Sequence, residues 1–193
     1  MMGIVHQYLT ALRFLLGMTL VVGFLYPVGI FIVGYTAFTH EAKGSFVTLN
    51  GHEIGSSLIG QNFPGDIWFH SRLSAAGKSG YDGLSSGATN AGPNEPSLVK
   101  SVASQREEVA KEESIQSSHV PPEAITTSGS GLDPDISPAY AYLQAARVAN
   151  SRKVPLSAVN SLIQQMIRPR LLGFLGEPRV NVLLLNVAMN SLK

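Results

Sequence analysis

The chain has 193 residues, of which 14 are Lys or Arg and 13 are Asp or Glu, so that 14% are charged against roughly 25% in an average soluble domain. Positions 14–39 contain no Asp, Glu, Lys or Arg, and about 20 apolar residues suffice to span a bilayer. This composition excludes a purely soluble protein, and the lack of a second such stretch excludes a multi-span transporter. Cysteine is absent, which excludes disulfides, thiolate nucleophiles and Cys-ligated zinc sites.

The first predicted element is a transmembrane helix over residues 14–38, after a short N-terminal segment of residues 1–13. A cleaved signal peptide is the alternative, but its apolar region would be only about 7–15 residues long, so we expect a retained anchor. Arg13 precedes the apolar stretch. By the positive-inside rule we therefore expect a cytoplasmic N-terminus and an external soluble domain over residues 39–193.

Small residues recur along one side of this predicted helix. A spacing of three or four residues places them on the same face, where the backbone of another helix can approach closely. We therefore expect a helix-packing face, with chance placement of common membrane glycines as the alternative. The face consists of Thr19, Gly23, Pro27, Ile30 and Gly34.

The fold class expected for the remaining chain is α+β, with a single mixed domain of short strands and about four helices. Residues 44–96 are rich in Gly, Ser, Asn and Pro, and their short apolar pieces are typical of brief strands between turns. The predicted strands cover residues 46–49, 56–59 and 67–69.

Helical periodicity dominates after residue 96, and prolines mark where helices begin or end. The last segment is ambiguous, because Val180, Val182 and Leu184 alternate as in a strand while the wider pattern has the helical period; we choose a helix. The predicted helices cover residues 97–113, 138–151, about 156–168 and 180–188.

Charge is unevenly distributed along the domain. Residues 41–136 carry 6 basic and 12 acidic side chains, a net −6, whereas residues 137–193 carry 7 basic and 1 acidic, a net +6. We expect the two parts to complement each other within one fold, with a basic surface for an acidic partner as the alternative. Nucleic acid is not an expected partner, because Lys and Arg are not clustered among aromatic residues.

Short motifs that look catalytic or metal-binding lack their required companions. The Gly-Lys-Ser at 77–79 has no Gly at position 72, so it is not a phosphate-binding loop. Ser97 and Lys100 have the spacing of a catalytic dyad without its companion motifs, and the five histidines are scattered. We expect no catalytic residue and no metal site, with a membrane-anchored hydrolase that uses Ser97 or Ser130 as an alternative.

Residues 126–138 form the most distinctive stretch, because their glycines, prolines and short hydroxyl side chains predict an ordered loop before a helix. Gln144, Arg147 and Ser151 follow on that helix as one polar stripe. Backbone N–H groups before a helix N-terminus can bind anions, phosphates included. A loop that only packs and caps the helix is the alternative.

Six further segments follow one another over nearly the whole chain and are more specific together than singly: 55–63, 68–75, 90–96, 126–138, 144–149 and 176–182. With the N-terminal apolar span, they resemble the KdpC family, the C subunits of Kdp-type potassium-transporting ATPases of bacteria. The chain lacks the Asp-Lys-Thr-Gly sequence that P-type pumps phosphorylate. It therefore resembles an accessory subunit rather than the pump itself.

The resemblance implies a non-catalytic subunit of an ATP-driven, high-affinity potassium importer. In such a complex a channel-like subunit passes potassium, and a separate pump subunit hydrolyses ATP with Mg. This subunit would stabilise their assembly and act as a catalytic chaperone that raises the pump's affinity for ATP. Its partners would be these two subunits and membrane lipid, it would hold no cofactor of its own, and it would be a single-pass protein of the bacterial inner membrane.

By the same resemblance, nucleotide contacts are expected at Ser128, Gly129, Ser130, Gly131 and Gln144. The orientation argued from Arg13 opposes direct contact, because the domain would lie across the membrane from cytosolic ATP. Two hypotheses stay open. An external domain would act on nucleotide affinity only through coupled states, whereas a cytosol-facing domain would bind nucleotide directly.

Overall fold

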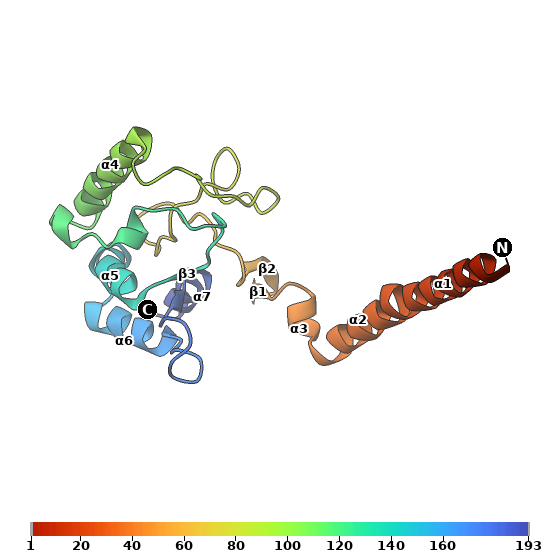
Figure 1. The fold of residues 1–193 in the computed structure, drawn as a ribbon. Helices are drawn as coiled ribbons and strands as arrows, with labels where there is room; N and C mark the ends of the chain where they lie inside the picture. Colours follow the sequence, from red (N-terminus) through yellow and green to blue (C-terminus); the bar gives the residue numbers. More distant parts are fainter. Residues whose placement is uncertain (1, 193) are drawn as a thin grey trace. The chain divides into compact units, whose positions relative to one another are not determined.

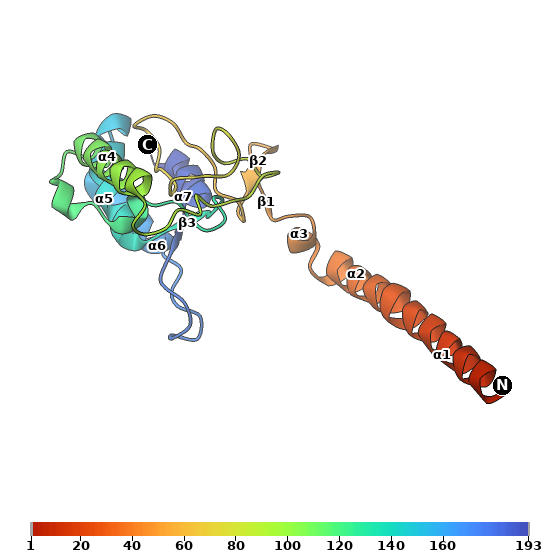
Figure 2. The same ribbon diagram turned by 45° about the horizontal axis from the view of Figure 1, so that its top comes forward.

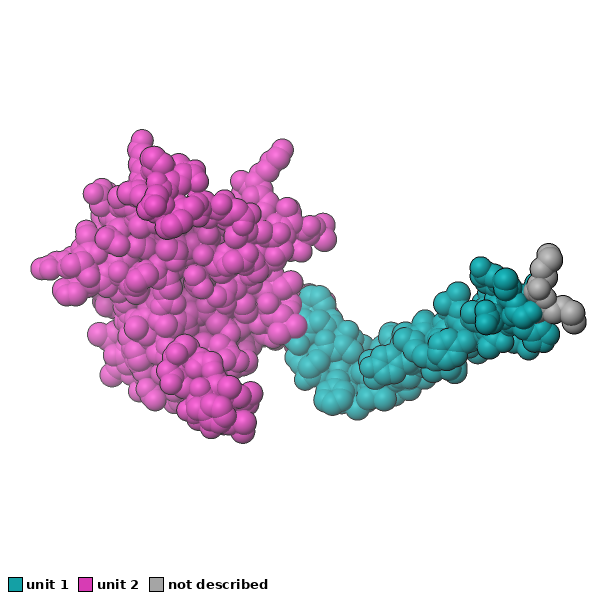
Figure 3. All heavy atoms as spheres, in the orientation of Figure 1, with its two compact units in different colours: residues 1–46 teal, residues 47–193 magenta. Residues whose placement is uncertain are grey.

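The computed structural model describes residues 2–192, and the chain divides into two compact units. The first unit ends at Phe46 and the second begins at Val47, as Figure 3 shows by colour. The soluble domain predicted from the sequence starts at residue 39, and the second compact unit starts at Val47.

The first unit is almost entirely helical. Helix α1 (Met2–Leu20) continues through a π-helical turn (Val21–Leu25) into α2 (Tyr26–Ala37), and the short α3 (Thr39–Ala42) follows. The apolar helix Gly3–Ala37 has 35 residues and a mean hydropathy of 2.2, which makes it long and apolar enough to cross a membrane. At about 1.5 Å per residue it is roughly 50 Å long, more than the roughly 30 Å of hydrocarbon in a bilayer.

The π turn lies just before Pro27, and its position has a physical reason. A proline inside a helix has no N–H to donate, and its ring crowds the carbonyl four residues earlier. In the π turn the N–H of Tyr26 bonds to the carbonyl of Val21, five residues back. A widened turn thus accommodates the proline, and the helix continues to Ala37.

The second unit is a mixed α+β domain, as the sequence predicted (Figure 1). It contains two small two-stranded sheets, β1–β2 and β3–β4. The second is antiparallel and pairs Asp135 with Asn181 and Ile136 with Val180. The elements are β1 (Phe46–Leu49), β2 (His52–Ser56), α4 (Pro96–Glu112), β3 (Asp135–Ile136), α5 (Pro138–Arg152), α6 (Leu156–Met166), β4 (Val180–Asn181) and α7 (Val182–Ala188), with 3-10 turns at Ser117–His119, Pro122–Ala124 and Met189–Ser191.

The helices α5 and α6 lie side by side (Figures 1 and 2). The hydroxyl of Ser137 caps α5 by accepting a bond from the N–H of Tyr140, and Pro138 occupies the first turn, where its missing N–H costs nothing. Lys153 ends α5 in the left-handed conformation. The apolar sides of both helices are buried, including Val148, Val159 and Ile163 at 0% exposure.

Two predicted strands differ from the structure. The strand expected at 56–59 lies earlier, at His52–Ser56, because Asn50 and Gly51 have positive φ and make a two-residue hairpin turn from β1. Residues 67–69 form no strand. The C-terminal segment contains both a strand and a helix. Val180–Asn181 is a strand, and the helix predicted from residue 180 begins at Val182.

Candidate functional site

The predicted packing face of the membrane helix is exposed in the chain itself. Thr19, Gly23, Pro27 and Ile30 are exposed and Gly34 is only partly covered. No residue of the most apolar 18-residue window is buried. The two glycines have open space beside them, because an added Cβ would meet only the methyl group of Thr19 at 3.7 Å from Gly23 and nothing within 4 Å of Gly34. A second helix therefore has room to approach here.

The loop over residues 126–133 ties together segments that lie far apart in the sequence. The carbonyl of Ser130 accepts bonds from the N–H of Gly87 and the hydroxyl of Ser86, both at 2.9 Å. The hydroxyl of Ser74 donates to the carbonyl of Gly131, whose φ of +68° suits glycine. Ser128 and Gly131 are buried. The loop is ordered, as the sequence predicted, and its polar groups bind other parts of the domain.

The N-terminus of α5, where the sequence suggested an anion site, already holds a carboxylate. Glu123 accepts bonds from both the N–H of Ser137, at 3.0 Å, and its hydroxyl. A carboxylate at this end also complements the helix dipole. The carboxylate of Glu123 thus sits where a phosphate would have to bind, and an incoming anion would meet its negative charge.

Gln144 lies in the interior of the domain, at 0% exposure. Its amide oxygen accepts bonds from the N–H of His70 at 2.7 Å and from Nη2 of Arg147 at 2.9 Å. Its amide nitrogen donates to the carbonyl of His70 at 3.2 Å. No hydrogen bond joins Gln144 to the loop at 126–133 among the residues that the structure describes, so the structure does not bring the two parts of the expected nucleotide site into contact.

Asn186 on α7 holds the neighbouring residue in the same way. Its oxygen accepts from the N–H of Phe69 at 2.8 Å, and its nitrogen donates to the carbonyl of Phe69 at 2.9 Å. The peptide groups of Phe69 and His70 are thus held by two side-chain amides, one from α7 and one from α5. These contacts replace the strand pairing expected at 67–69 and satisfy backbone groups that would be costly to bury unpaired.

Arg147 and Glu113 form the charged part of this polar cluster, with Nε of Arg147 2.9 Å from Oε1 of Glu113. Arg147 also donates to the carbonyls of Asp66 and Trp68, each at 2.9 Å. Burial raises the pKa of the Glu113 carboxyl above its usual value, against the opposing effect of the Arg147 guanidinium. The ion pair joins the acidic and basic parts of the sequence, which confirms the expected complementarity at this point.

His70 lies at the edge of the cluster, with Nδ1 3.2 Å from Oε1 of Glu112 and Nε2 3.2 Å from the carbonyl of Gly65. Burial lowers the pKa of its imidazole below the usual value, and the charge of Arg147 lowers it further. The carboxylate of Glu112 has a smaller, opposing effect. The side chains of the cluster thus hold the backbone of residues 66–70 in place.

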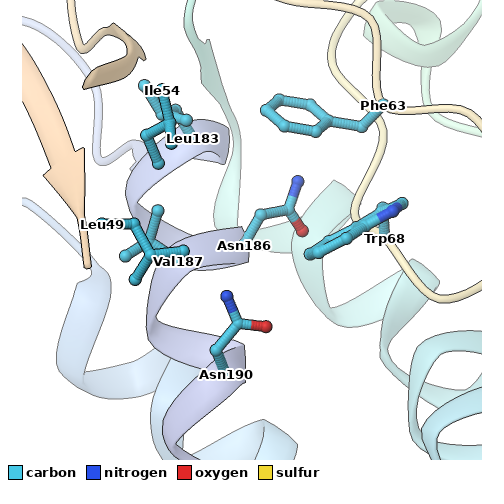
Figure 4. Close-up of a pocket in the computed structure, with 8 residues that line it drawn as sticks. All are labelled: Leu49, Ile54, Phe63, Trp68, Leu183, Asn186, Val187 and Asn190. Carbon is cyan, nitrogen blue, oxygen red and sulfur yellow. The ribbon is translucent and has the colours of Figure 1, made fainter. Parts of the chain in front are cut away.

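An apolar pocket of about 190 Å³ lies on the other side of this segment (Figure 4). Figure 4 shows Phe63 and Trp68 facing the helix α7 across it. The guanidinium of Arg152 stacks on the ring of Trp68, 4.5 Å from its centre. The pocket is lined by Leu49, Ile54, Phe63, Trp68, Leu183, Asn186, Val187 and Asn190. Such a lining suits an apolar group. None of the lining side chains is cationic, so the pocket has no feature typical of a phosphate site.

In the part of the chain that the structure describes, neither of the residues kept as alternative nucleophiles has a general base that is itself oriented by a third side chain. The hydroxyl of Ser97 donates to Glu95 at 2.5 Å, on an exposed surface. The hydroxyl of Ser130 accepts from the N–H of Leu132 and lies 3.5 Å from that of Ser128. The carboxylate beside Ser97 is exposed and has no other side-chain partner among the described residues, and Ser130 has no base, so neither serine has the oriented base that acyl transfer requires.

Comparison with known proteins gives one consistent result. The pattern of the KdpC family, described as the c chain of a K+-transporting ATPase, matches residues 8–191. The KdpC subunit of the potassium-transporting ATPase of Gemmatimonas aurantiaca is 46% identical over 90% of this chain and 86% of its own length. The corresponding subunit of Kineococcus radiotolerans is 46% identical over 98% and 95%, and that of Acidobacterium capsulatum is 43% identical over 95% and 97%. The chain belongs to the KdpC family.

Proposed function

We propose that this protein is a non-catalytic, single-pass subunit of a potassium-importing P-type ATPase complex, and that it stabilises the assembly of a channel-like subunit with a pump subunit. The observation that carries this proposal is the helix Gly3–Ala37, which is strongly apolar and has no buried residue in its most apolar window. Such a surface needs lipid or other membrane helices to cover it.

The face of Thr19, Gly23, Pro27, Ile30 and Gly34 supports contact with a partner helix. The open space beside Gly23 and Gly34 permits close approach of two backbones, and small residues favour such packing in membranes. The remaining apolar side chains, such as Phe14 and Phe31, are large and exposed and suit lipid. We therefore assign the small-residue face to a partner subunit and the rest of the helix to the bilayer.

In this proposal the protein lies in the bacterial inner membrane with a cytoplasmic N-terminus, and its domain is external. ATP and Mg belong to the pump subunit, and potassium is the transported ion. An effect on the pump's affinity for ATP would then pass through coupled conformations of the subunits. Two contacts also favour the indirect route over direct nucleotide binding. The side-chain amide of Gln144 already bonds to the backbone of His70, and the carboxylate of Glu123 already occupies the start of α5.

Assembly tests the packing face directly. We expect Gly23→Leu to reduce co-purification of the channel-like and pump subunits with the full chain, because a leucine side chain separates the helices. Gly29→Leu is the matched control, since Gly29 lies six residues away on another side of the helix and its surroundings are also open. Equal co-purification of both variants with the wild type would exclude the face.

Labelling in intact cells tests the orientation. Because the chain has no cysteine, Ser117→Cys gives a single reactive thiol at an exposed position of the domain. We expect an impermeant thiol reagent to label it from outside. Protection in intact cells together with labelling after lysis would show that the domain faces the cytosol. Direct nucleotide binding would then be the favoured hypothesis.

A further inference from the structure

Between α6 and α7 the chain forms a hairpin that projects from the helices of the domain (Figures 1 and 2). At its base Arg168 and Arg179 exchange two backbone hydrogen bonds, of 2.8 and 3.1 Å. Near its end Leu171 and Leu175 exchange two more, both of 2.9 Å. Gly173 has a φ of +82° and lies in the turn between them. These bonds hold the end of the hairpin in one backbone conformation.

The end of this hairpin is apolar and exposed. Its side chains are between 47% and 77% exposed, although a core of buried apolar residues lies in the same domain. Soluble surfaces rarely gather large apolar side chains in this way unless the patch has a binding role. The hairpin tip consists of Leu171, Leu172, Phe174 and Leu175.

Basic side chains surround the base of the hairpin. Arg170 is paired with Glu177 at 2.6 Å and Arg179 with Asp135 at 3.0 Å. Arg168 has no ion pair among the residues that the structure describes. The three arginines with Glu177 and Asp135 carry a net charge of +1, so that the hairpin presents an apolar end with a weakly cationic base, in which Arg168 is the arginine without an ion pair within residues 2–192. This order of groups matches a bilayer surface, where anionic headgroups lie above the acyl chains.

The length of the connection keeps the domain near the membrane, if the helix is anchored there as proposed above. The helix ends at Ala37 and the second unit begins at Val47. The nine residues between them can span at most roughly 30 Å, since an extended chain covers 3.3–3.6 Å per residue. A tethered tip meets the bilayer at high effective concentration, so that weak insertion of a few side chains suffices.

We propose that the hairpin tip inserts into the headgroup zone of an anionic bilayer and thereby steadies the domain at the membrane surface. Four side chains on one projecting turn cover much less than the roughly 800 Å² per partner of a stable protein interface. Insertion into lipid has no such minimum area, because each buried apolar group contributes by itself. The arginines at the base then lie at the level of the phosphates.

The absence of cysteine allows a direct test with single labels. The full chain, with an environment-sensitive fluorophore at Leu172→Cys, is placed in nanodiscs of phosphatidylcholine and phosphatidylglycerol that carry a nitroxide on the upper acyl chain. Leu84→Cys is the matched control, because Leu84 is a fully exposed leucine of the same domain. Val22→Cys, within the apolar helix, reports whether the anchor itself is in the lipid.

We expect several-fold stronger quenching at position 172 than at position 84, and a loss of that difference when Phe174→Ser is added or when phosphatidylglycerol is omitted. Equal quenching at 172 and 84, with strong quenching at 22, overturns the inference but leaves the anchor intact. Weak quenching at all three positions removes the anchor and the inference together. If position 172 is shielded only when the other subunits are present, the tip binds protein and the inference is wrong.

Discussion

In the core of the C-terminal domain, apolar side chains are buried against one another and the buried amides are hydrogen-bonded, whereas the helix Gly3–Ala37 leaves its apolar surface uncovered. Both regions contain many apolar residues, although positions 14–39 also lack any charged residue. The difference is that the partners of the core's groups lie within this chain, while those of the helix must come from outside it.

Substitutions in the two regions should therefore affect different measurements. A change in the helix face should alter assembly and leave the unfolding of the domain unchanged. A change in the polar cluster around Gln144 should lower the free energy of unfolding first, and affect assembly only as a consequence. Trp68 is the single tryptophan and lies in the domain, so its fluorescence reports domain unfolding in the full chain.

The largest effect is expected for Arg147→Met. The change leaves Glu113 buried without its partner and removes the bonds to the carbonyls of Asp66 and Trp68. Removing one partner of a buried ion pair costs about 3–5 kcal/mol. Denaturant unfolding of the full chain in detergent, followed by Trp68 fluorescence, measures this loss.

Two controls sharpen that result. Arg168→Met alters an exposed arginine without an ion pair among the described residues, and should change the unfolding free energy by less than about 0.5 kcal/mol. Adding Glu113→Leu to Arg147→Met should recover part of the loss, because the unpaired buried charge is then gone. A loss of similar size in all three variants would show that the cluster does not hold the domain.

A smaller effect is expected for the loop. Gly131 has a φ of +68°, and an added Cβ would lie 2.5 Å from the carbonyl oxygen of Gly87 and 2.7 Å from the nitrogen of Ala76. We expect Gly131→Ala to destabilise the domain by about 1–3 kcal/mol. Gly129→Ala should be near neutral, since nothing lies within 4 Å of its added Cβ. Thermal unfolding of the pair checks this, and equal midpoints would contradict the assigned role of the loop.

Much of this domain could be predicted from the sequence because its helices carry local signals. Pro96 and Pro138 stand at the starts of α4 and α5, and proline in a first helical turn costs no hydrogen bond. The helical spacing of apolar residues predicted α6, in which Val159 and Ile163 are buried. These signals lie within a few residues of the elements that they specify.

The polar cluster could not be predicted in the same way, because its contacts join residues that are far apart. Asn186 and Phe69 are 117 positions apart, and Gln144 and His70 are 74 apart. The sequence treated Gln144 as part of a polar stripe, yet it lies on the buried side of α5 with Tyr140 and Ala141. A polar residue on an otherwise apolar helix face was the available signal.

Separation in the sequence also explains why the carboxylate at the start of α5 could not be predicted. The sequence correctly predicts that a helix begins at residue 138, and a helix N-terminus does attract negative charge. It could not show that Glu123, 14 residues earlier, supplies that charge. Whether an N-terminus is open to a ligand depends on the tertiary fold, since the local sequence is the same in both cases.

The smallest expected effect is on the dependence of stability on pH, and it belongs to the domain alone. Burial lowers the pKa of folded His70 below its ordinary value of 6.5, and Arg147 adds to this against Glu112. The unfolded chain therefore takes up this proton at higher pH than the folded one. The stabilisation is complete above about pH 6.5 and declines as the pH falls through the folded pKa.

Glu113 acts with the opposite sign, because burial raises its folded pKa above the ordinary value of 4.5, so that its protonation favours the folded state as the pH falls. A decline in stability as the pH falls below about 6.5 should thus come from His70, since Glu113 changes stability in the other direction. We expect His70→Gln to flatten it, and His119→Gln, at an exposed histidine, to preserve it. Unfolding midpoints across this range measure both variants. A decline that survives His70→Gln would place the titrating group outside the polar cluster, and the cluster would then hold the segment at His70 without sensing its protonation.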